Sequence, residues 1–309
     1  MKILGIGNAI VDVICKVDDS FITQNNLTKS TMKLFFDENE FRKLLTNLKI
    51  EKTISGGSVA NSIVGISQLG DKAGFLGKIS DDEFGIKYEE GLKKENVEYF
   101  YKKKKELLPT GSCLILVTPD HERTMCTFLG TAGKINETDI NSDVIKKSEM
   151  IFLEGYLWDE GEPTKAFNKA INNANKVAMS LSDRFCVDRH KADFLNLLKN
   201  KLDITFANEE EIKSLIDAKN FNEVIDFSKQ LNKLIIITRG ENGSIAVKGE
   251  EIVENDIQKN LKIVDLTGAG DLFAAGFLHG YLNKLSIKQC LKKGTEMSSK
   301  VIQQIGARL

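Results

Sequence analysis

The stretch that decides the fold runs from Ile263 to Leu278 and reads IVDLTGAGDLFAAGFL. Its composition predicts an apolar strand end at 263–266, a turn of small residues at 268–270 and a nearly all-apolar helix after the turn. Backbone N–H groups at a helix start lack intrahelical partners, and the helix dipole adds positive potential there. Gly268, Ala269 and Gly270 therefore predict a site for an anion such as a phosphoryl group.

Asp271 places a carboxylate in the first turn of that helix, beside the predicted anion site. On this stretch alone two interpretations stay open. Asp is favoured near helix starts for ordinary stability reasons, so Asp271 can simply be a cap. A carboxylate beside a phosphate is electrostatically unfavourable, however, and a general base for an attacking hydroxyl group would explain why it is there.

Composition limits the class of protein. The chain has 309 residues, 41% of them hydrophobic and 28% charged, which suits one large α/β domain or two modest ones. Its net charge of −1 gives no argument for nucleic acid as a partner. No segment is long enough to span a membrane, and the start does not resemble a signal peptide. Five scattered cysteines without a C-x-x-C pair indicate reduced thiols, so we expect a cytoplasmic protein.

Outward from the deciding stretch, apolar strand-like runs alternate with helical segments. Strands are expected at 2–6, 73–76, 150–153, 176–181, 204–207, 234–238 and 243–247. Helices are expected at 163–173, 191–198, 209–216 and 221–231, and from Ile63 to a stop at Gly70. Repeated βα units predict an α/β fold whose largely parallel sheet is covered by helices on both faces.

Two other regions have a different texture. Short strand-like segments separated by turns fill about 11–36 and 97–130, including Val97–Tyr101 and Gly111–Thr118. They predict a small β-sheet apart from the main one, and so a candidate lid. Because no linker or low-complexity tract divides the chain, we expect residues 1–309 to form a single domain that includes this lid.

Polar residues stand where several of the expected strands end, which is where ligands collect in an open α/β sheet. The candidates are Asp12, Gly56, Gly57, Asn61, Asn208, Glu211, Thr238, Gly240 and Gly243. Each has a plain alternative: Asp12 can lie on a solvated face, the glycines can serve turns, and Asn208 to Glu211 can cap a helix. A dinucleotide fingerprint at Gly5 and Gly7 is disfavoured, because Ile10 stands where its third glycine belongs and the sequence after it is typical of a strand.

Taken together, these motifs resemble the ribokinase-like (phosphofructokinase B-type) carbohydrate kinases along nearly the whole chain. One family signature, a Gly-Gly followed by Asn and a helix ending in Leu-Gly, is matched by Gly56, Gly57, Asn61, Leu69 and Gly70. The Asp-x-x-Gly-Ala-Gly-Asp signature is matched by Asp265, Gly268, Ala269, Gly270 and Asp271. Asn208 and Glu211 match Asn-x-x-Glu, and Thr238, Gly240 and Gly243 match Thr-x-Gly-x-x-Gly.

The resemblance implies a three-layer α/β/α fold with a mostly parallel sheet, a small β lid and phosphoryl transfer from ATP. It implies Asp271 as the base and the 268–270 amides as the anion hole. Its other implied roles are sugar binding by Asp12, Gly57 and Asn61, with Gly56 beside them, and ATP binding by Asn208, Thr238, Gly240 and Gly243. It further implies Mg²⁺ held through water by Glu211, and a K⁺ ion near Asp265, Thr267 and the turn at Gly306.

Within the family, the segments Gly5–Asp12 and Gly56–Ser62 resemble adenosine kinases more than ribokinases or fructokinases. This implies phosphorylation of the 5′-hydroxymethyl group of a nucleoside, above all adenosine to AMP. Arg123 resembles a lid arginine that reaches the transferred phosphate. Tyr156 and Trp158, with Met32 or Leu34, are candidate walls for the base, and core packing explains them equally well.

Two alternatives stay open: a kinase of a simple sugar, and a catalytically silent ligand-binding homologue. The intact Asp271, anion-hole turn and Asn208/Glu211 pair argue against the silent reading. The chain can act as a monomer or a homodimer, because an exposed lid edge can pair with a second subunit or close over a substrate.

Overall fold

The large sheet forms the centre of the molecule. The computed structural model describes residues 1–120, 122–159 and 163–309. In these residues nine strands pair in the order β14-β13-β12-β11-β10-β9-β1-β5-β6, parallel except for the antiparallel pairs β12/β13 and β13/β14. The strands are β1 (Ile3–Ile6), β5 (Ala73–Leu76), β6 (Glu98–Tyr99), β9 (Met150–Glu154), β10 (Val177–Ser180), β11 (Ile204–Asn208), β12 (Leu234–Thr238), β13 (Ser244–Lys248) and β14 (Glu251–Asn255).

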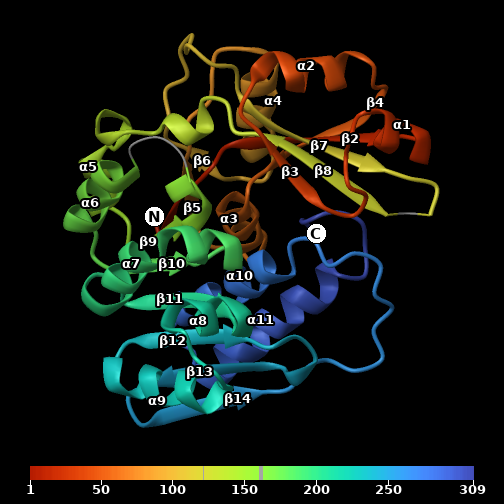
Figure 1. The fold of residues 1–309 in the computed structure, drawn as a ribbon. Coiled ribbons are helices and arrows are strands. Elements are labelled where there is room, and N and C mark those ends of the chain that lie inside the picture. The colour runs from red at the N-terminus through yellow and green to blue at the C-terminus, as the bar shows by residue number, and fades with distance from the viewer. Residues whose placement is uncertain (121, 160–162) are drawn as a thin grey trace.

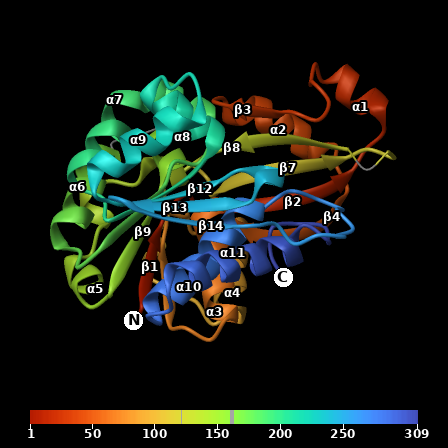
Figure 2. The same cartoon turned by 90° about the horizontal axis from the view of Figure 1, so that it is seen from below.

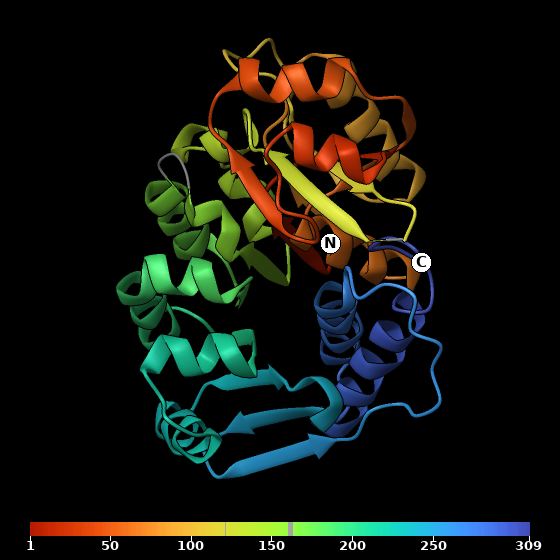
Figure 3. The ribbon, with the colours of Figure 1, turned by 45° about the vertical axis from the view of Figure 1, so that its right-hand side comes forward.

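Helices cover both faces of this sheet, as Figures 1 and 2 show. Side chains alternate along each strand: in β1, Ile3 joins one core, whereas Leu4 and Ile6 join the other. The first core holds α3 (Ser58–Gln68), α4 (Glu83–Lys94), α10 (Ala269–Leu282) and α11 (Ile287–Val301). The second core holds α5 (Ser142–Lys146), α6 (Pro163–Asn173), α7 (Arg184–Asn200), α8 (Glu209–Ile216) and α9 (Phe221–Leu231). The expected three-layer α/β/α fold is confirmed, and Figure 3 separates its green and blue helix layers.

A second, smaller sheet lies at one end of the molecule, at the top of Figure 1. Its strand order is β3-β8-β7-β2-β4. Val11, Val13 and Cys15 of β2 are buried on the face that joins the first core, while Asp12 and Ile14 point to the other face. The elements of this region are α1 (Asp19–Gln24), α2 (Glu38–Thr46), β2 (Ile10–Lys16), β3 (Met32–Phe35), β4 (Ile50–Gly56), β7 (Gly111–Val117) and β8 (Arg123–Phe128).

The small sheet differs from the predicted one in two strands. The segment expected there at Val97–Tyr101 contributes β6 to the large sheet, where Glu98 and Tyr99 pair with Gly74 and Phe75 of β5. The helical crossover α4 between β5 and β6 brings β6 back parallel to β5, which local composition does not reveal. Conversely, β4 belongs to the small sheet but was not predicted, because it begins with the exposed, mostly charged run 50–52.

The expected strand end at 263–266 is also wrong. This segment is irregular, and Ile263 and Leu266 are 62% and 66% exposed. The amides of Val264 and Asp265 both donate to the Ile302 carbonyl, at 2.8 and 3.2 Å, so the segment follows the end of α11. The apolar residues of 263–266 therefore predict a strand that the chain does not form.

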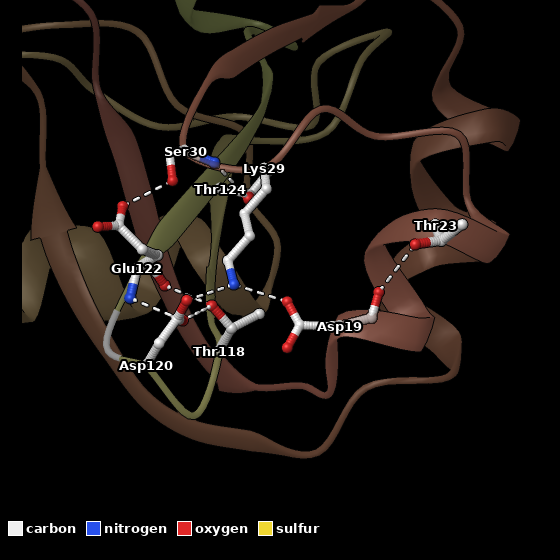
Figure 4. A network of polar contacts seen from close by, with 8 residues as sticks. All are labelled: Asp19, Thr23, Lys29, Ser30, Thr118, Asp120, Glu122 and Thr124. Carbon is white, nitrogen blue, oxygen red and sulfur yellow. Dashed lines mark hydrogen bonds and ion pairs between the residues drawn. The ribbon is translucent and has the colours of Figure 1, made fainter.

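Polar contacts tie the outer end of the small sheet to the segment before β3 (Figure 4). The Lys29 ammonium lies between two carboxylates, 2.6 Å from Asp19 Oδ1 and 2.5 Å from Asp120 Oδ2. Ser30 Oγ donates to Glu122 Oε2 at 2.6 Å. The ion pair with Lys29 holds the pKa of the Asp120 carboxyl well below its usual range. These contacts fix the turn after β7 against the chain that leads into β3.

The remaining short elements are the 3₁₀ helices η1 (Ala132–Lys134), η2 (Glu137–Asp139), η3 (Gly155–Asp159) and η4 (Gly240–Asn242). All five cysteines are described by the structure; each is buried and none forms a disulfide. Among the helices that the structure describes, none combines the length and the apolar character that crossing a bilayer requires.

Candidate active site

Two cavities meet near the start of α10. The small-sheet cavity, of about 580 Å³, is lined by strands of the small sheet, by Asn61 and by the segment 304–309. The helix-start cavity, of about 380 Å³, is lined by Gly268 to Asp271 together with residues from the ends of β11 and β12. Asp271 lines the second cavity and is hydrogen-bonded to Asn61, which lines the first. A group held by Asp271 is thus within reach of both spaces.

The Asp271 carboxylate is turned toward α3. Ser58 Oγ donates to its Oδ1 at 2.6 Å, and Asn61 Nδ2 donates to its Oδ2 at 3.0 Å. The helix begins at Ala269 with Gly268 as its N-cap residue and has no side-chain cap, so Asp271 does not act as the hydrogen-bonded cap that the sequence left open. Burial raises the pKa of Asp271 to about 6, although the hydrogen bonds from Ser58 and Asn61 favour its ionised form. A carboxyl group with this pKa can accept a proton near neutral pH.

The turn at 268–270 has the geometry of an anion site. Gly268 has φ +78°, a conformation that glycine adopts without strain. Leu272 is the first residue of α10 to donate along the helix, to the Gly268 carbonyl at 2.9 Å. The Ala269 amide donates to the Leu266 carbonyl at 3.2 Å, so this amide already has a partner. Gly268, Ala269 and Gly270 all line the helix-start cavity. The positive end of the α10 dipole therefore points into that cavity.

Asp12 lies in the small-sheet cavity, at the middle of β2. Burial raises its pKa to about 7, the Arg308 charge opposes this rise, and the Asp271 charge adds to it. Gly56 and Gly57 stand beside the cavity but do not line it. A Cβ atom at Gly56 would lie 2.4 Å from Asp12 Oδ2, and one at Gly57 would lie 2.3 Å from the Asn8 carbonyl oxygen. The paired glycines thus leave room for the Asp12 carboxylate and for the start of α3.

Asn208 and Glu211 form a reciprocal cap at the start of α8. Asn208 Oδ1 accepts from the Glu211 amide at 2.8 Å, and Glu211 Oε2 accepts from the Asn208 amide at 3.0 Å. The interpretation that Asn208 and Glu211 cap a helix is therefore correct. Both side chains also line the helix-start cavity, and burial raises the pKa of Glu211 to about 7.

The donor set around Glu211 fits a hydrated Mg²⁺ ion. Each of its carboxylate oxygens accepts one hydrogen bond from Asn208, which leaves lone pairs for water. Mg²⁺ usually keeps several of its waters, so a carboxylate can hold it without a direct bond. In the residues that the structure describes, no cluster of three or more His, Cys, Asp or Glu side chains is placed to bind a metal directly.

The three residues of the Thr-x-Gly-x-x-Gly motif lie differently. Thr238 ends β12 and lines the helix-start cavity. Gly240 and Gly243 lie in the turn between β12 and β13, with φ +54° and +75°, and are not among the residues lining that cavity. A Cβ at Gly243 would lie 2.2 Å from the Asn255 carbonyl oxygen, so its role is to let β13 and β14 approach.

Asp265 is surrounded by donors. Its Oδ1 accepts from Thr267 N and Oγ1, at 3.1 and 2.7 Å, and its Oδ2 accepts from Gly306 N at 2.8 Å and pairs with Arg123. Burial opposes ionisation, but Arg123 and the other donors hold the pKa of Asp265 below its usual value. The positive charge at Asp265 is thus the Arg123 guanidinium, so the expected K⁺ contact does not fit the residues as they lie.

The comparisons with known proteins agree with this geometry. The model of the pfkB family of carbohydrate kinases matches residues 6–309. The chain belongs to the pfkB carbohydrate kinase family. It is therefore a phosphotransferase that acts on an alcohol group, and the family implies ATP and typically Mg²⁺.

Two solved structures and one curated relative illustrate the range within the pfkB family. An adenosine kinase from Sinorhizobium meliloti is 36% identical with TM-score 0.90, over 100% of this chain and 95% of that one. A probable sugar kinase from Rhizobium etli is also 36% identical, with TM-score 0.89, over 99% of this chain and 94% of that one. Adenosine kinase 2 of Arabidopsis thaliana is 25% identical, over 98% of this chain and 94% of its own length.

The two aromatic residues considered as walls for the base, Tyr156 and Trp158, lie in different places in this pfkB kinase. Trp158 is packed in the second core against Phe167 and Phe194, and its Nε1 donates to Asp193 Oδ2 at 3.1 Å. Tyr156 lines the helix-start cavity. The side chains of Met32 and Leu34 are not among those lining either cavity.

Glu154 is a functional candidate that the sequence reading missed. It ends β9, it is 1% exposed, and it accepts from Asn8 Nδ2 and from the Val59 amide, both at 3.0 Å. It thus fixes the start of α3, two residues before Asn61. Burial raises its pKa to about 7, and the nearby Asp271 charge adds to the rise. A lone carboxylate in an apolar strand is the same signal that marked Asp12.

The buried Glu154 carboxyl is expected to make stability depend on pH. Its pKa is raised from 4.5 to about 7, so between these values the folded chain binds a proton that the unfolded chain has lost. Stability therefore falls as pH rises through this window, by up to about 3 kcal/mol. Glu154→Gln removes the titration. The free energy of unfolding of Glu154→Gln in urea, taken relative to that of the wild type, should therefore be larger at pH 8 than at pH 5.

Glu149→Gln, an exposed change one residue before β9, is the matched control and should leave the pH dependence as it is. If the free energies of unfolding of the wild type and of Glu154→Gln differed by the same amount at both pH values, the Glu154 carboxyl would not titrate in this range.

Proposed function

We propose that this chain transfers the γ-phosphoryl group of ATP to the 5′-hydroxymethyl group of a nucleoside, above all of adenosine, to give AMP. The observation that carries the proposal is the place of Asp271. Its carboxylate lies beside the turn at 268–270 and is joined through Asn61 to the neighbouring small-sheet cavity. A hydroxyl group entering from that cavity would meet a base and an anion site at the same point.

Each part of the proposed reaction has a residue of this chain. Asp271 takes the proton of the attacking hydroxyl, and the 268–270 amides stabilise the negative charge of the transferring group. ATP would lie in the helix-start cavity beside Thr238 and Asn208, with Glu211 holding the waters of Mg²⁺. The ion, when bound, neutralises the phosphate charge. Gly240 and Gly243 would support the nucleotide site by shaping its turn.

The small-sheet cavity suits a nucleoside because it is polar at one place and apolar at another. Asp12 and Asn61 offer an acceptor and an amide for ribose hydroxyl groups. Strands of the small sheet add an apolar wall, suited to a base, made of Ile14, Ile115, Val117 and Met125. We also propose that this sheet acts as a lid and that Arg123, which lines the cavity, turns from Asp265 toward the phosphate when substrates bind.

A sugar kinase is the second candidate. It is favoured by the probable sugar kinase from Rhizobium etli, which matches this chain as well as the Sinorhizobium meliloti adenosine kinase does. A simple sugar would use Asp12 and Asn61 and leave the apolar wall empty. Nucleoside and sugar thus differ in whether that wall contributes to binding.

The test is ADP release from ATP and Mg²⁺ with a panel of purine nucleosides, pyrimidine nucleosides and simple sugars. We expect adenosine to give the highest kcat/KM. Selective turnover of a sugar would show that the chain is a sugar kinase rather than a nucleoside kinase. If no compound stimulated ADP release, a silent ligand-binding protein would be favoured instead.

Asp12→Asn is expected to raise the KM for the acceptor. A hydrogen bond to a charged group contributes about 1.5–3 kcal/mol, so loss of the charge should raise KM by roughly 10- to 100-fold. The effect on kcat should be small, because Asp12 touches hydroxyl groups that do not react. Initial rates at saturating ATP measure both constants. A fall in kcat with unchanged KM would contradict the assignment of Asp12 to substrate binding.

A further inference from the structure

The segment after α11 returns to the cavity that we assign to the acceptor. Residues 304–309 form part of the lining of the small-sheet cavity. The segment is fastened by the Gly306 amide on Asp265 Oδ2 at 2.8 Å and by Gln68 Nε2 on the Leu309 carbonyl at 3.2 Å. It also contributes the only buried arginine nitrogen without a hydrogen-bond partner in the described part of the chain, Nη2 of Arg308.

The Arg308 side chain is aimed at the centre of the site. Its Nε donates to Asn61 Oδ1 at 2.9 Å, and Asn61 Nδ2 in turn donates to Asp271 Oδ2 at 3.0 Å. Guanidinium only donates, and an ionised carboxylate only accepts. The Asn61 amide therefore has one possible orientation, with its oxygen toward Arg308 and its NH₂ group toward Asp271.

We infer that Arg308 is a positioning residue of the transfer site: it orients Asn61 toward Asp271, places a positive charge between Asp12 and Asp271, and offers Nη2 to an acceptor atom of the substrate. The inference rests on the proposed phosphoryl transfer at Asp271. It assigns a role in that site to a residue that no motif marks.

The charge is needed because two carboxylates share this region. The charge of Asp271 on α10 raises the cost of ionising Asp12 on β2, and the Arg308 charge favours the ionised form of both carboxylates. Tyr88 and Glu95, from α4 and its end, also face Arg308, and Glu154 from β9 faces Asp271. The cavity further carries Lys52, Lys87, Glu90, Lys94 and Arg123. Among the charged groups of the cavity, Arg308 is the one hydrogen-bonded to the Asn61–Asp271 pair.

The free Nη2 group points to the kind of substrate atom that it would meet. A buried donor without a partner costs free energy until an acceptor arrives. A substrate that places a ring oxygen, a hydroxyl oxygen or a ring nitrogen beside Arg308 supplies that acceptor. The Arg308 guanidinium would then hold the substrate and Asn61 at the same time.

The first test uses thermal unfolding of the full chain and needs no substrate. Asp12 and Asp271 have pKa values of about 7 and 6, above the 3.8 of an ordinary aspartate, so in the fold both are largely protonated at pH 5 and ionised at pH 8. Arg308→Gln should therefore lower Tm by at least about 3 °C more at pH 8 than at pH 5. Arg42→Gln, an exposed arginine paired with Glu38 on α2, is the control and should show no such difference.

Arg308→Lys keeps the charge and serves as a second variant. It should show the pH dependence of the wild type, whatever its absolute Tm. An Arg308→Gln loss in Tm that is the same at both pH values would overturn the charge role and leave Arg308 as a packing residue.

The second test uses kinetics with the acceptor that the compound panel selects. Arg308→Gln should raise the KM of that acceptor roughly tenfold and move the acid limb of kcat/KM to higher pH by about half a unit or more. Arg308→Lys should restore the acid limb but not KM. Unchanged KM and an unchanged limb would refute the inference, and a higher kcat/KM would mean that the segment blocks the cavity. If the wild type turns over no compound, the proposed function fails, while the unfolding test still decides the charge role.

Discussion

Replacing Asp271 by asparagine is expected to lower kcat by roughly 10²- to 10⁴-fold, the usual contribution of a positioned general base. The amide has the size of the carboxylate but cannot take the proton of the attacking hydroxyl. Its oxygen can accept from Asn61 Nδ2, and its NH₂ group can donate to Ser58 Oγ, so the local hydrogen bonds have counterparts. Acceptor and ATP dissociation constants, measured by calorimetry, should stay within a few-fold of the wild-type values.

The pH profile gives an independent check of the same assignment. Burial raises the pKa of Asp271 to about 6, so wild-type turnover should fall as pH drops through this value and the base becomes protonated. Residual activity of Asp271→Asn should lack that acid limb. Asp226→Asn, an exposed change on α9, is the matched control and should keep both the rate and the limb. Near wild-type turnover by Asp271→Asn would mean that another group is the base.

Gly268→Ala is expected to have the second large effect, on both stability and rate. Gly268 has φ +78°, and an added Cβ would lie 2.6 Å from Ala307 Cα and 2.7 Å from Ala307 Cβ. A left-handed conformation at a residue other than glycine costs about 1–3 kcal/mol, and the backbone at Ala307 must also move. Because this shift would displace the amides at the start of α10, kcat should fall by about 10²-fold or more.

Gly70→Ala distinguishes the cost of backbone strain from the cost of a steric clash. Gly70 also has a positive φ, +96°, but an added Cβ there would meet nothing within 4 Å, and the residue lies outside the site. It should lose about 1 kcal/mol of unfolding free energy in urea and keep its turnover. If Gly268→Ala loses stability but keeps the wild-type kcat, the amides at 268–270 do not hold the transferring group.

The strands of the large sheet could be predicted where the local signal is strong. The runs that become β9, β11 and β12 are four or five residues of nearly continuous apolar sequence, and α-helical segments follow β9 and β11. The strand β4 could not be found in this way, because it begins with three exposed residues and is fixed by pairing with β2. The place of β6 depends on the crossover of α4, which is a property of the whole chain rather than of its sequence at Glu98 and Tyr99.

The residues of the site also differ in whether a local sequence signal marks them. Asp271, Asn61 and the 268–270 turn could be predicted because glycine spacing and a lone polar group mark them locally. Glu154 carried the same signal as Asp12 and could have been found. Arg308 could not, because its position depends on a contact with Asn61, 247 residues away in the sequence. For Asp265 the sequence motif is clear, but the motif does not reveal the partner Arg123, which comes from the small sheet.

The small-sheet cavity joins residues from Val11 to Leu309, and this has a consequence for biosynthesis. At about 5–20 residues per second, a ribosome that has made Asp12 needs roughly 15–60 s to reach Arg308. During that time the nascent chain can fold its first βα units, but the Asp12 carboxylate has no guanidinium beside it. The pocket therefore closes after almost all of the sequence is made, so a ribosome-bound fragment should be folded in part before it can bind a substrate.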